Sequence, residues 1–181
     1  VMRSMLSQDG IINVMLKNAG WIQKSLPFFS NVAWARITVI VVNLWIGIPY
    51  TMMQVTGILQ NIPLELYEAA EVDGAGPVIR FFKITLPYML FVTTPYLITT
   101  FTANINNFNI VYLLTKGDPV LSGNTAGKTD LLVTWLYKMT GDYQYYNLGA
   151  VIGIMTFVFL AIGSLLVYRR TKSYKDEEGF Q

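Results

Sequence analysis

Long uncharged hydrophobic stretches alternate with short polar segments along this chain. Three intervals contain no charged side chain, and they lie between Arg36 and Glu65, between Lys83 and Lys116 and between Tyr143 and Tyr168. Each interval exceeds the roughly 20 apolar residues that a helix needs to cross a bilayer. The pattern therefore predicts three membrane-spanning helices at about residues 32–59, 85–114 and 146–168. Burial of three such helices in a soluble core is the alternative, but a domain of this size has little room for them.

The segments around these spans carry their own signals. Residues 1–32 mix charges with short apolar runs, which favours short interfacial helices or loops. Prolines inside the first two spans predict bends or breaks, and they are Pro49, Pro87 and Pro95. Residues 115–145 are polar, with an amphipathic helix expected over 130–138. Gly149 and Gly153 allow a close helix approach in the third span, where ordinary packing explains them better than a specific dimer.

Composition narrows the class of protein. Hydrophobic residues make up 53% and charged residues 13% of the 181 positions, and soluble domains usually carry about 25% charged residues. Cysteine and histidine are absent, which removes thiol chemistry, Cys/His zinc sites and histidine acid–base catalysis. A net charge of +2 is too small to indicate nucleic-acid binding. The mixed segment that opens the chain at Val1 suggests the later part of a longer protein.

Basic residues set the expected orientation. Four of them follow the third span: Arg169, Arg170, Lys172 and Lys175. Cytoplasmic flanks of membrane helices are enriched in Lys and Arg, so this tail is expected in the cytoplasm. Three spans then place residues 61–84 on the cytoplasmic side and residues 115–145 outside.

A charged island between the first two spans, Glu65 to Lys83, is the most distinctive segment. Asp73-Gly74 is a strong helix stop, because glycine accepts the left-handed conformation. Gly76-Pro77 is then suited to start a second short helix. An ordered helix–glycine–helix element at a membrane face indicates a surface that a partner holds, and an ordinary surface loop is the alternative.

The island resembles the EAA motif of ABC importer permeases. The residues that carry the resemblance are Glu68, Ala69, Ala70, Asp73, Gly74 and Gly76, with Leu86-Pro87 beyond them. The resemblance implies an all-α membrane protein, part of a type I ABC importer transmembrane domain. It also implies that residues 61–84 are coupling helices that dock into a cleft on an ATPase subunit.

Further segments resemble the maltose/maltodextrin, or MalF-type, permease subunits, and they are Asn43–Tyr50, Asn104–Phe108 and Thr129–Val133. In that family the sugar lies midway through the membrane. Carried over by position, the sugar-binding residues are Asn43, Trp45, Gly47, Tyr50, Thr100, Asn104 and Asn107. Asparagine amides both donate to and accept from hydroxyls, and aromatic rings offer apolar faces to sugars. Hydrogen bonding that only holds the spans together is the alternative.

The resemblance also implies partners and excludes catalysis by this chain. The implied partners are a second permease subunit, an ABC ATPase dimer that holds ATP and Mg²⁺, an extracytoplasmic sugar-binding protein and an oligosaccharide. The implied location of the chain is a bacterial inner membrane. The chain itself is expected to bind no cofactor. An ABC permease for another uncharged oligosaccharide or a polyol remains an alternative. A secondary transporter or a structural membrane subunit is another, although the spans lack the Asp or Glu residues common in ion coupling.

Overall fold

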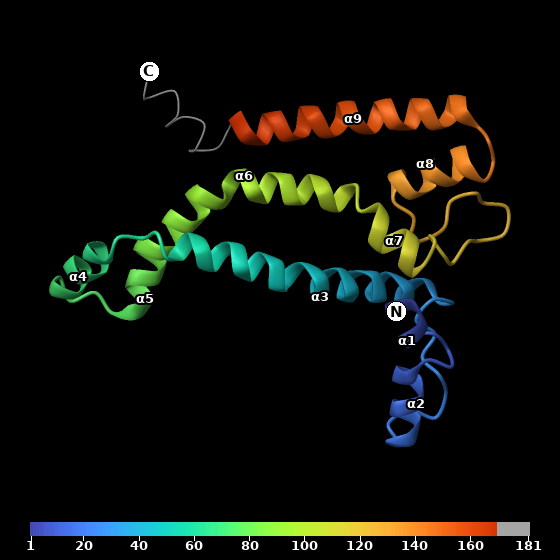
Figure 1. Cartoon of the computed structure of the whole chain (residues 1–181), viewed down its shortest axis with the longest axis horizontal. Helices are drawn as coiled ribbons and strands as arrows, with labels where there is room; N and C mark the ends of the chain where they lie inside the picture. Colours follow the sequence, from blue (N-terminus) through green and yellow to red (C-terminus); the bar gives the residue numbers. More distant parts are fainter. Residues whose placement is uncertain (170–181) are drawn as a thin grey trace. The chain divides into compact units, whose positions relative to one another are not determined.

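The computed structural model describes residues 1–169, and these residues form helices and loops without a strand (Figure 1). The helices are α1 (Met2–Met5), α2 (Ile11–Asn18), α3 (Val32–Leu59), α4 (Leu64–Val72), α5 (Pro77–Arg80), the π-helix η1 (Phe81–Thr85), α6 (Leu86–Ile105), α7 (Phe108–Leu114), α8 (Leu132–Gly141) and α9 (Tyr146–Arg169). Three described segments are long and apolar enough to cross a membrane, and they are Val32–Leu59, Pro77–Leu114 and Tyr146–Arg169. The number of candidate membrane-spanning segments therefore agrees with the prediction.

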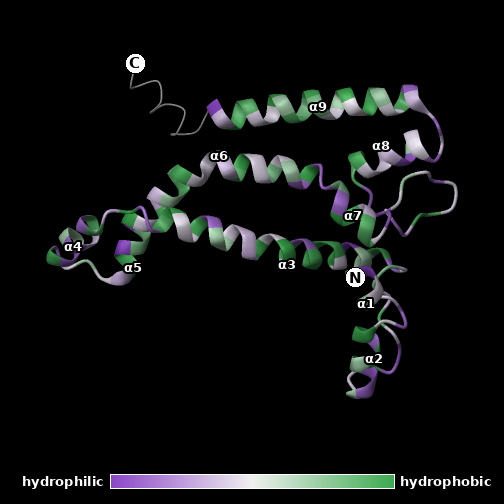
Figure 2. Cartoon of the chain, viewed as in Figure 1, coloured by the Kyte–Doolittle hydropathy of each residue, from purple (hydrophilic) through white to green (hydrophobic). Residues whose placement is uncertain are grey.

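The long helices expose their apolar side chains. Figure 2 shows hydrophobic residues along most of α9, and none of the residues in its most apolar window is buried. The share buried within the chain is also small for α3 and for the segment from α5 to α7. Helices that are apolar on all sides need lipid or partner helices around them. The chain is therefore a multi-pass membrane protein.

The chain divides into two compact units. Unit 1 comprises Val1–Ile46 and Asn104–Val158, and unit 2 comprises Gly47–Ala103 and the residues from Phe159 onward. The basic tail residues Arg170, Lys172 and Lys175 lie outside the described residues.

Residues 1–31 form two short helices and the loops that follow them, and a buried asparagine holds this segment together. Asn13 is fully buried on α2. Its Nδ2 donates to the carbonyl oxygens of Ser7 and Leu26, and its Oδ1 accepts from the Leu26 backbone N–H at 2.8 Å. Both the nitrogen and the oxygen of this buried amide are therefore hydrogen-bonded, as buried polar groups usually are.

The polar segment between α7 and α8 is an ordered loop, fixed by a buried ion pair. Lys138 Nζ lies 2.7 Å from Asp130 Oδ2, and their side chains are 11% and 3% exposed. The same carboxylate accepts from the Gly127 N–H at 2.7 Å and from Thr134 Oγ1 at 2.9 Å. The predicted amphipathic helix is present as α8, and it begins at Leu132 rather than Asp130 because Asp130 joins the loop to the helix.

An aromatic cluster packs α7 against α8. The rings of Phe108, Tyr112 and Tyr137 lie with centroids 4.8 to 5.0 Å apart. A hydrogen bond with Tyr112 raises the pKa of the Tyr137 hydroxyl above its ordinary value. Aromatic rings packed in this way stabilise a contact by more than the burial of their surface area alone. The cluster therefore holds α7 against α8 within unit 1.

Glycines bring α9 close to α8 within unit 1. A Cβ at Gly149 would overlap Thr140 Cγ2, and a Cβ at Gly153 would lie 3.3 Å from Leu136 Cδ1. The predicted close approach is therefore a contact within the chain.

Gly149→Ala is expected to destabilise the protein by about 1–3 kcal/mol, because it overpacks this contact. Thr140 cannot easily move aside, since its Oγ1 donates to the Leu136 carbonyl at 3.0 Å. Thermal unfolding of the purified protein measures the effect. Gly163→Ala on the same helix is the control, because a Cβ there meets nothing within 4 Å. Equal stability of the two variants would contradict the close packing.

Unit 2 contains the charged island and the start of the second span. η1 continues directly from α5 into α6, so the second span begins within an unbroken helical segment from Pro77. The Leu86 N–H bonds to the Phe81 carbonyl five residues earlier, which is a π-type bond. Pro87 follows and has no N–H to complete the usual α-helical bond to Lys83. This missing donor explains why the helix widens there.

The second predicted span, 85–114, is not one continuous helix. α6 ends at Ile105, and α7 restarts at Phe108. Asparagine side chains compete with helical backbone bonds, and Asn107 accepts from the Ile110 N–H as the N-cap of α7. The break therefore follows from Asn106-Asn107. Pro49 and Pro95, in contrast, remain inside α3 and α6.

Candidate functional site

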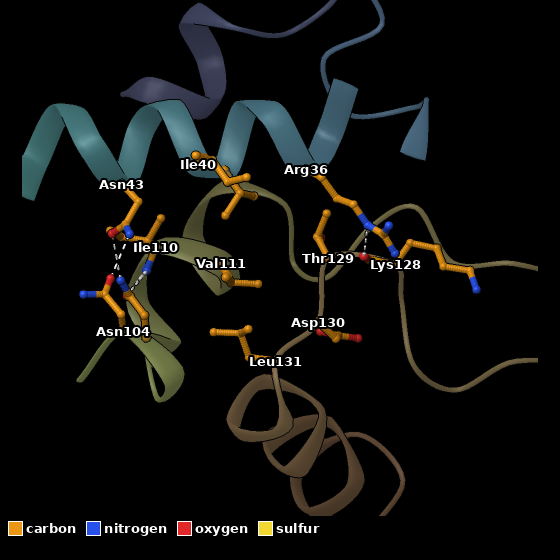
Figure 3. A pocket seen from close by; sticks show the side chains of 12 residues that line it. Arg36, Ile40, Asn43, Asn104, Ile110, Val111, Lys128, Thr129, Asp130 and Leu131 are labelled. Atoms are coloured by element: carbon orange, nitrogen blue, oxygen red, sulfur yellow. Dashed lines mark hydrogen bonds between the residues drawn. The ribbon is translucent and has the colours of Figure 1, made fainter. Parts of the chain in front are cut away.

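The three predicted sugar-binding asparagines meet in unit 1. Asn43 Nδ2 donates to Asn104 Oδ1 at 2.8 Å, and Asn107 Nδ2 donates to Asn43 Oδ1 at 3.0 Å (Figure 3). They come from α3, from α6 just before its end, and from the break that follows. We call these three residues the asparagine cluster. The helix break is what turns Asn107 toward α3, because Asn107 does not continue the helix that carries Thr100 and Asn104.

The asparagine cluster lines a cavity of about 300 Å³ in unit 1 (Figure 3). Its walls include aliphatic side chains such as Ile40, Val111 and Leu131, and Arg36, Lys128 and Asp130 also border it. A mostly apolar concavity with a few polar groups is typical of small-molecule sites. The arrangement suits a ligand with hydroxyl groups and apolar ring faces.

The other predicted sugar-binding residues are placed differently. Trp45 is 69% exposed on α3 and is not among the described residues that line the cavity. Gly47, Tyr50 and Thr100 belong to unit 2, where the Tyr50 ring centroid lies 6.5 Å from that of Tyr96. The structure thus brings together Asn43, Asn104 and Asn107, and it leaves the four others outside this cluster.

Sequence reasoning missed Arg36 and the loop residues of the cavity. Arg36 Nε donates to the Lys128 carbonyl at 3.2 Å, a contact between positions 92 residues apart. No local pattern predicts such a pairing. One signal was available, since Arg36 lies seven residues before Asn43 and therefore on the same helical face.

The charged island forms the element that the sequence predicts. α4 ends at Val72, Gly74 has φ +74°, and Gly76 is the N-cap of α5. Arg80 Nη1 lies 2.9 Å from Glu71 Oε2, and the hydroxyls of Tyr67 and Thr85 are 2.8 Å apart. These two contacts tie α4 to the segment formed by α5 and η1.

This element, α4 to α5, presents a surface that the described residues of unit 2 leave exposed. Glu68, Ala69, Asp73 and Gly74 are exposed, and Ala70 and Gly76 are half-buried. Large apolar side chains nearby are also exposed, and they include Leu64, Val72 and Val78 at 66%, 88% and 66%. An exposed apolar patch edged by charges is typical of a protein–protein contact.

Comparison with known proteins decides the family. Residues 10–173 match the family described as binding-protein-dependent transport system inner membrane component. The chain belongs to this family. Its members are permease subunits of ABC importers, which are not enzymes themselves.

Sugar permeases are among the relatives of this family member. The chain is 44% identical over 152 residues to the galactooligosaccharides transport system permease protein GanP of Bacillus subtilis, which covers 84% of the chain and 36% of GanP. It is 43% identical to the maltodextrin permease MdxF of the same species, over 80% of the chain and 34% of MdxF. It is 43% identical to the maltose/maltodextrin permease MalF of Escherichia coli strain K12, over 87% of the chain and 31% of MalF. The chain spans about a third of the length of these relatives.

The fold is that of solved ABC importer permeases. A bacterial ABC transporter that imports the acidic polysaccharide alginate has a chain with TM-score 0.75, over 94% of this chain and 59% of that one. The same kind of transporter in complex with a periplasmic protein bound to an alginate pentasaccharide gives 0.78, over 94% and 58%. Both are 23% identical.

Proposed function

We propose that this chain is part of a permease subunit that carries maltodextrin-type oligosaccharides through the membrane in an ATP-driven importer. The observation that carries the proposal is that this member of the permease family has both an asparagine-lined cavity and an exposed α4–α5 element. The cavity offers amide groups to the hydroxyls of a polyhydroxyl ligand. The names of GanP, MdxF and MalF support an oligosaccharide.

The α4–α5 element is the proposed contact with an ATPase subunit. Glu68 and Asp73 supply charge, and Ala69, Ala70, Gly74 and Gly76 allow close approach. In this proposal the element faces the cytoplasm, together with the C-terminal tail. ATP with Mg²⁺ is held by the ATPase dimer, and this chain forms the translocation pathway with a second permease subunit and receives sugar from an extracytoplasmic binding protein.

The proposal also keeps the four other residues carried over by resemblance as sugar-contacting residues. Trp45 and Tyr50 offer aromatic faces, Thr100 a hydroxyl, and Gly47 open space around its Cα. Family membership favours an importer over a secondary transporter or a structural subunit. The similarity to GanP keeps another uncharged oligosaccharide as the second candidate substrate.

Sugar-dependent ATP hydrolysis tests the proposal. The full-length polypeptide that contains these residues is reconstituted in lipid vesicles with its second permease, ATPase and binding protein. We expect hydrolysis to rise when maltotetraose is added, and a galactooligosaccharide to do so only if the second candidate holds. A rate of ATP hydrolysis that no oligosaccharide changes would contradict the proposal.

Asn107→Ala is expected to reduce sugar-stimulated hydrolysis about tenfold while the complex stays assembled, since a lost hydrogen bond that leaves a partner unsatisfied costs about 1–3 kcal/mol. Because Asn107 also caps α7, Asn107→Ser is the matched variant. Serine is a good N-cap but is too short to reach Asn43. If both variants lose sugar-stimulated hydrolysis equally, the effect is due to the loss of the Asn107 amide. If the serine variant has normal activity, the only role of Asn107 is to cap α7.

A further inference from the structure

Arg36 and the asparagine cluster border the same cavity at a fixed separation. Arg36 and Asn43 lie seven residues apart on α3, which places them on one face and about 10 Å apart along the helix axis. Figure 3 shows both side chains directed to the side of α3 that the cavity occupies, with aliphatic side chains between them. A single pyranose ring is shorter than this separation.

The guanidinium of Arg36 is held in place through one nitrogen. Nε donates to the Lys128 carbonyl at 3.2 Å. The two terminal NH₂ groups of Arg36 have no protein acceptor among the described residues. A guanidinium carries five N–H donors in a rigid fork and no acceptor, so the fork is positioned to bind oxygen atoms of a ligand.

The carbonyl that holds Arg36 belongs to a fixed loop. The neighbouring Thr129 is buried, its Oγ1 donates to the Asp118 carbonyl at 2.6 Å, and its N–H donates to the Gly117 carbonyl at 3.2 Å. Lys128 N–H also donates to the Pro119 carbonyl at 2.9 Å. The position of Arg36 therefore depends on an ordered backbone rather than on a mobile one.

The carboxylate at the cavity wall does not compete for Arg36. Asp130 is paired with Lys138 at 2.7 Å and its side chain is only 3% exposed. Arg36 therefore remains available to ligand hydroxyls, which accept hydrogen bonds from guanidinium groups.

We propose that Arg36 determines chain length in the substrate site by donating hydrogen bonds to hydroxyl oxygens of a neutral oligosaccharide whose other end lies at the asparagine cluster. This inference rests on the proposed function. A monosaccharide bound at the asparagines does not extend to Arg36, whereas an oligosaccharide does. Arg36 is thus a specificity-determining residue for the longer ligand.

Calorimetric binding to the complete permease–ATPase complex in nanodiscs, without binding protein, tests this inference. Maltotetraose is titrated directly, and glucose is measured by competition against it. Arg36→Ala is expected to weaken maltotetraose about tenfold, the effect of losing a charge-assisted hydrogen bond, and to leave glucose unchanged. Arg36→Lys keeps the charge without the fork, so most of the loss is expected to remain.

Lys17→Ala is the matched charge control. It removes one positive charge from α2, where Lys17 is exposed and is not among the described residues that line the cavity. We expect wild-type binding of both sugars and an unchanged Tm.

Other outcomes separate the alternatives. Equal weakening of both sugars by Arg36→Ala, or a lowered Tm, would show a structural role and overturn the inference, as would unchanged binding or full rescue by lysine. Tighter binding of an oligogalacturonate than of maltotetraose would replace the neutral ligand with a carboxylate-bearing one. A wild-type complex that binds and responds to no sugar would instead refute the proposed function.

Discussion

An aspartate in place of Gly74 is expected to lower ATP-driven uptake by about tenfold or more while the protein still reaches the membrane. Gly74 has φ +74°, a region where an L side chain costs about 1–2 kcal/mol. The added carboxylate would lie at the negative end of the α4 dipole, next to Asp73. Both effects favour another path of the chain between α4 and α5, so the element would no longer present its surface correctly. Transport of labelled maltotetraose into vesicles measures the loss.

Two variants separate backbone strain from a general sensitivity of the loop. Gly76→Ala is expected to be tolerated, because Gly76 has φ −67° and a Cβ there meets nothing within 4 Å. Gly74→Asn should give an intermediate loss, since asparagine accepts positive φ better than most residues. Uptake that is equally low in Gly76→Ala, or normal in Gly74→Asp, would contradict the role of the turn.

Lys138→Met is expected to destabilise the protein by about 3–5 kcal/mol, because it leaves the buried Asp130 carboxylate without its cation. That carboxylate also accepts from the Gly127 N–H, so the loop between α7 and α8 depends on it. Thermal unfolding of the purified complex measures the change. Because this loop holds Arg36, we expect sugar binding to weaken as well.

The double variant Lys138→Met with Asp130→Asn tests the cause. It removes both charges but keeps an oxygen acceptor, so it should be more stable than Lys138→Met alone. Lys128→Met removes a positive charge that has no carboxylate partner among the described residues, and little loss is expected there. If Lys128→Met and Lys138→Met are equally stable, the buried pair is not what holds the loop.

The spans and the α4–α5 element were predictable because their signals are local. Uncharged stretches longer than a bilayer crossing predict α3 and α9 directly, and Asp73-Gly74 and Gly76-Pro77 specify where α4 ends and α5 begins. The break after Ile105 was missed, although the sequence Asn106-Asn107 carried a signal for it. Apolar periodicity alone does not reveal a helix end that a side chain caps.

The cavity was predictable only in part. Resemblance pointed to Asn43, Asn104 and Asn107, but the bonds among them depend on the helix break. Arg36 meets Lys128 through contacts far apart in the sequence, and the ion pair of Asp130 with Lys138 depends on how the loop folds onto α8. Such contacts arise from tertiary packing, which hydrophobic patterns do not encode.

Co-purification of an ATPase subunit with the full-length polypeptide tests the central claim most directly. Membranes are solubilised from cells that carry either the wild type or the variant Glu68→Lys with Gly74→Asp, and both are isolated at equal expression. We predict that the ATPase accompanies the wild type and is lost from the variant. An ATPase that is absent from the wild type, or retained equally by the variant, would contradict the assignment of the α4–α5 element as the coupling surface.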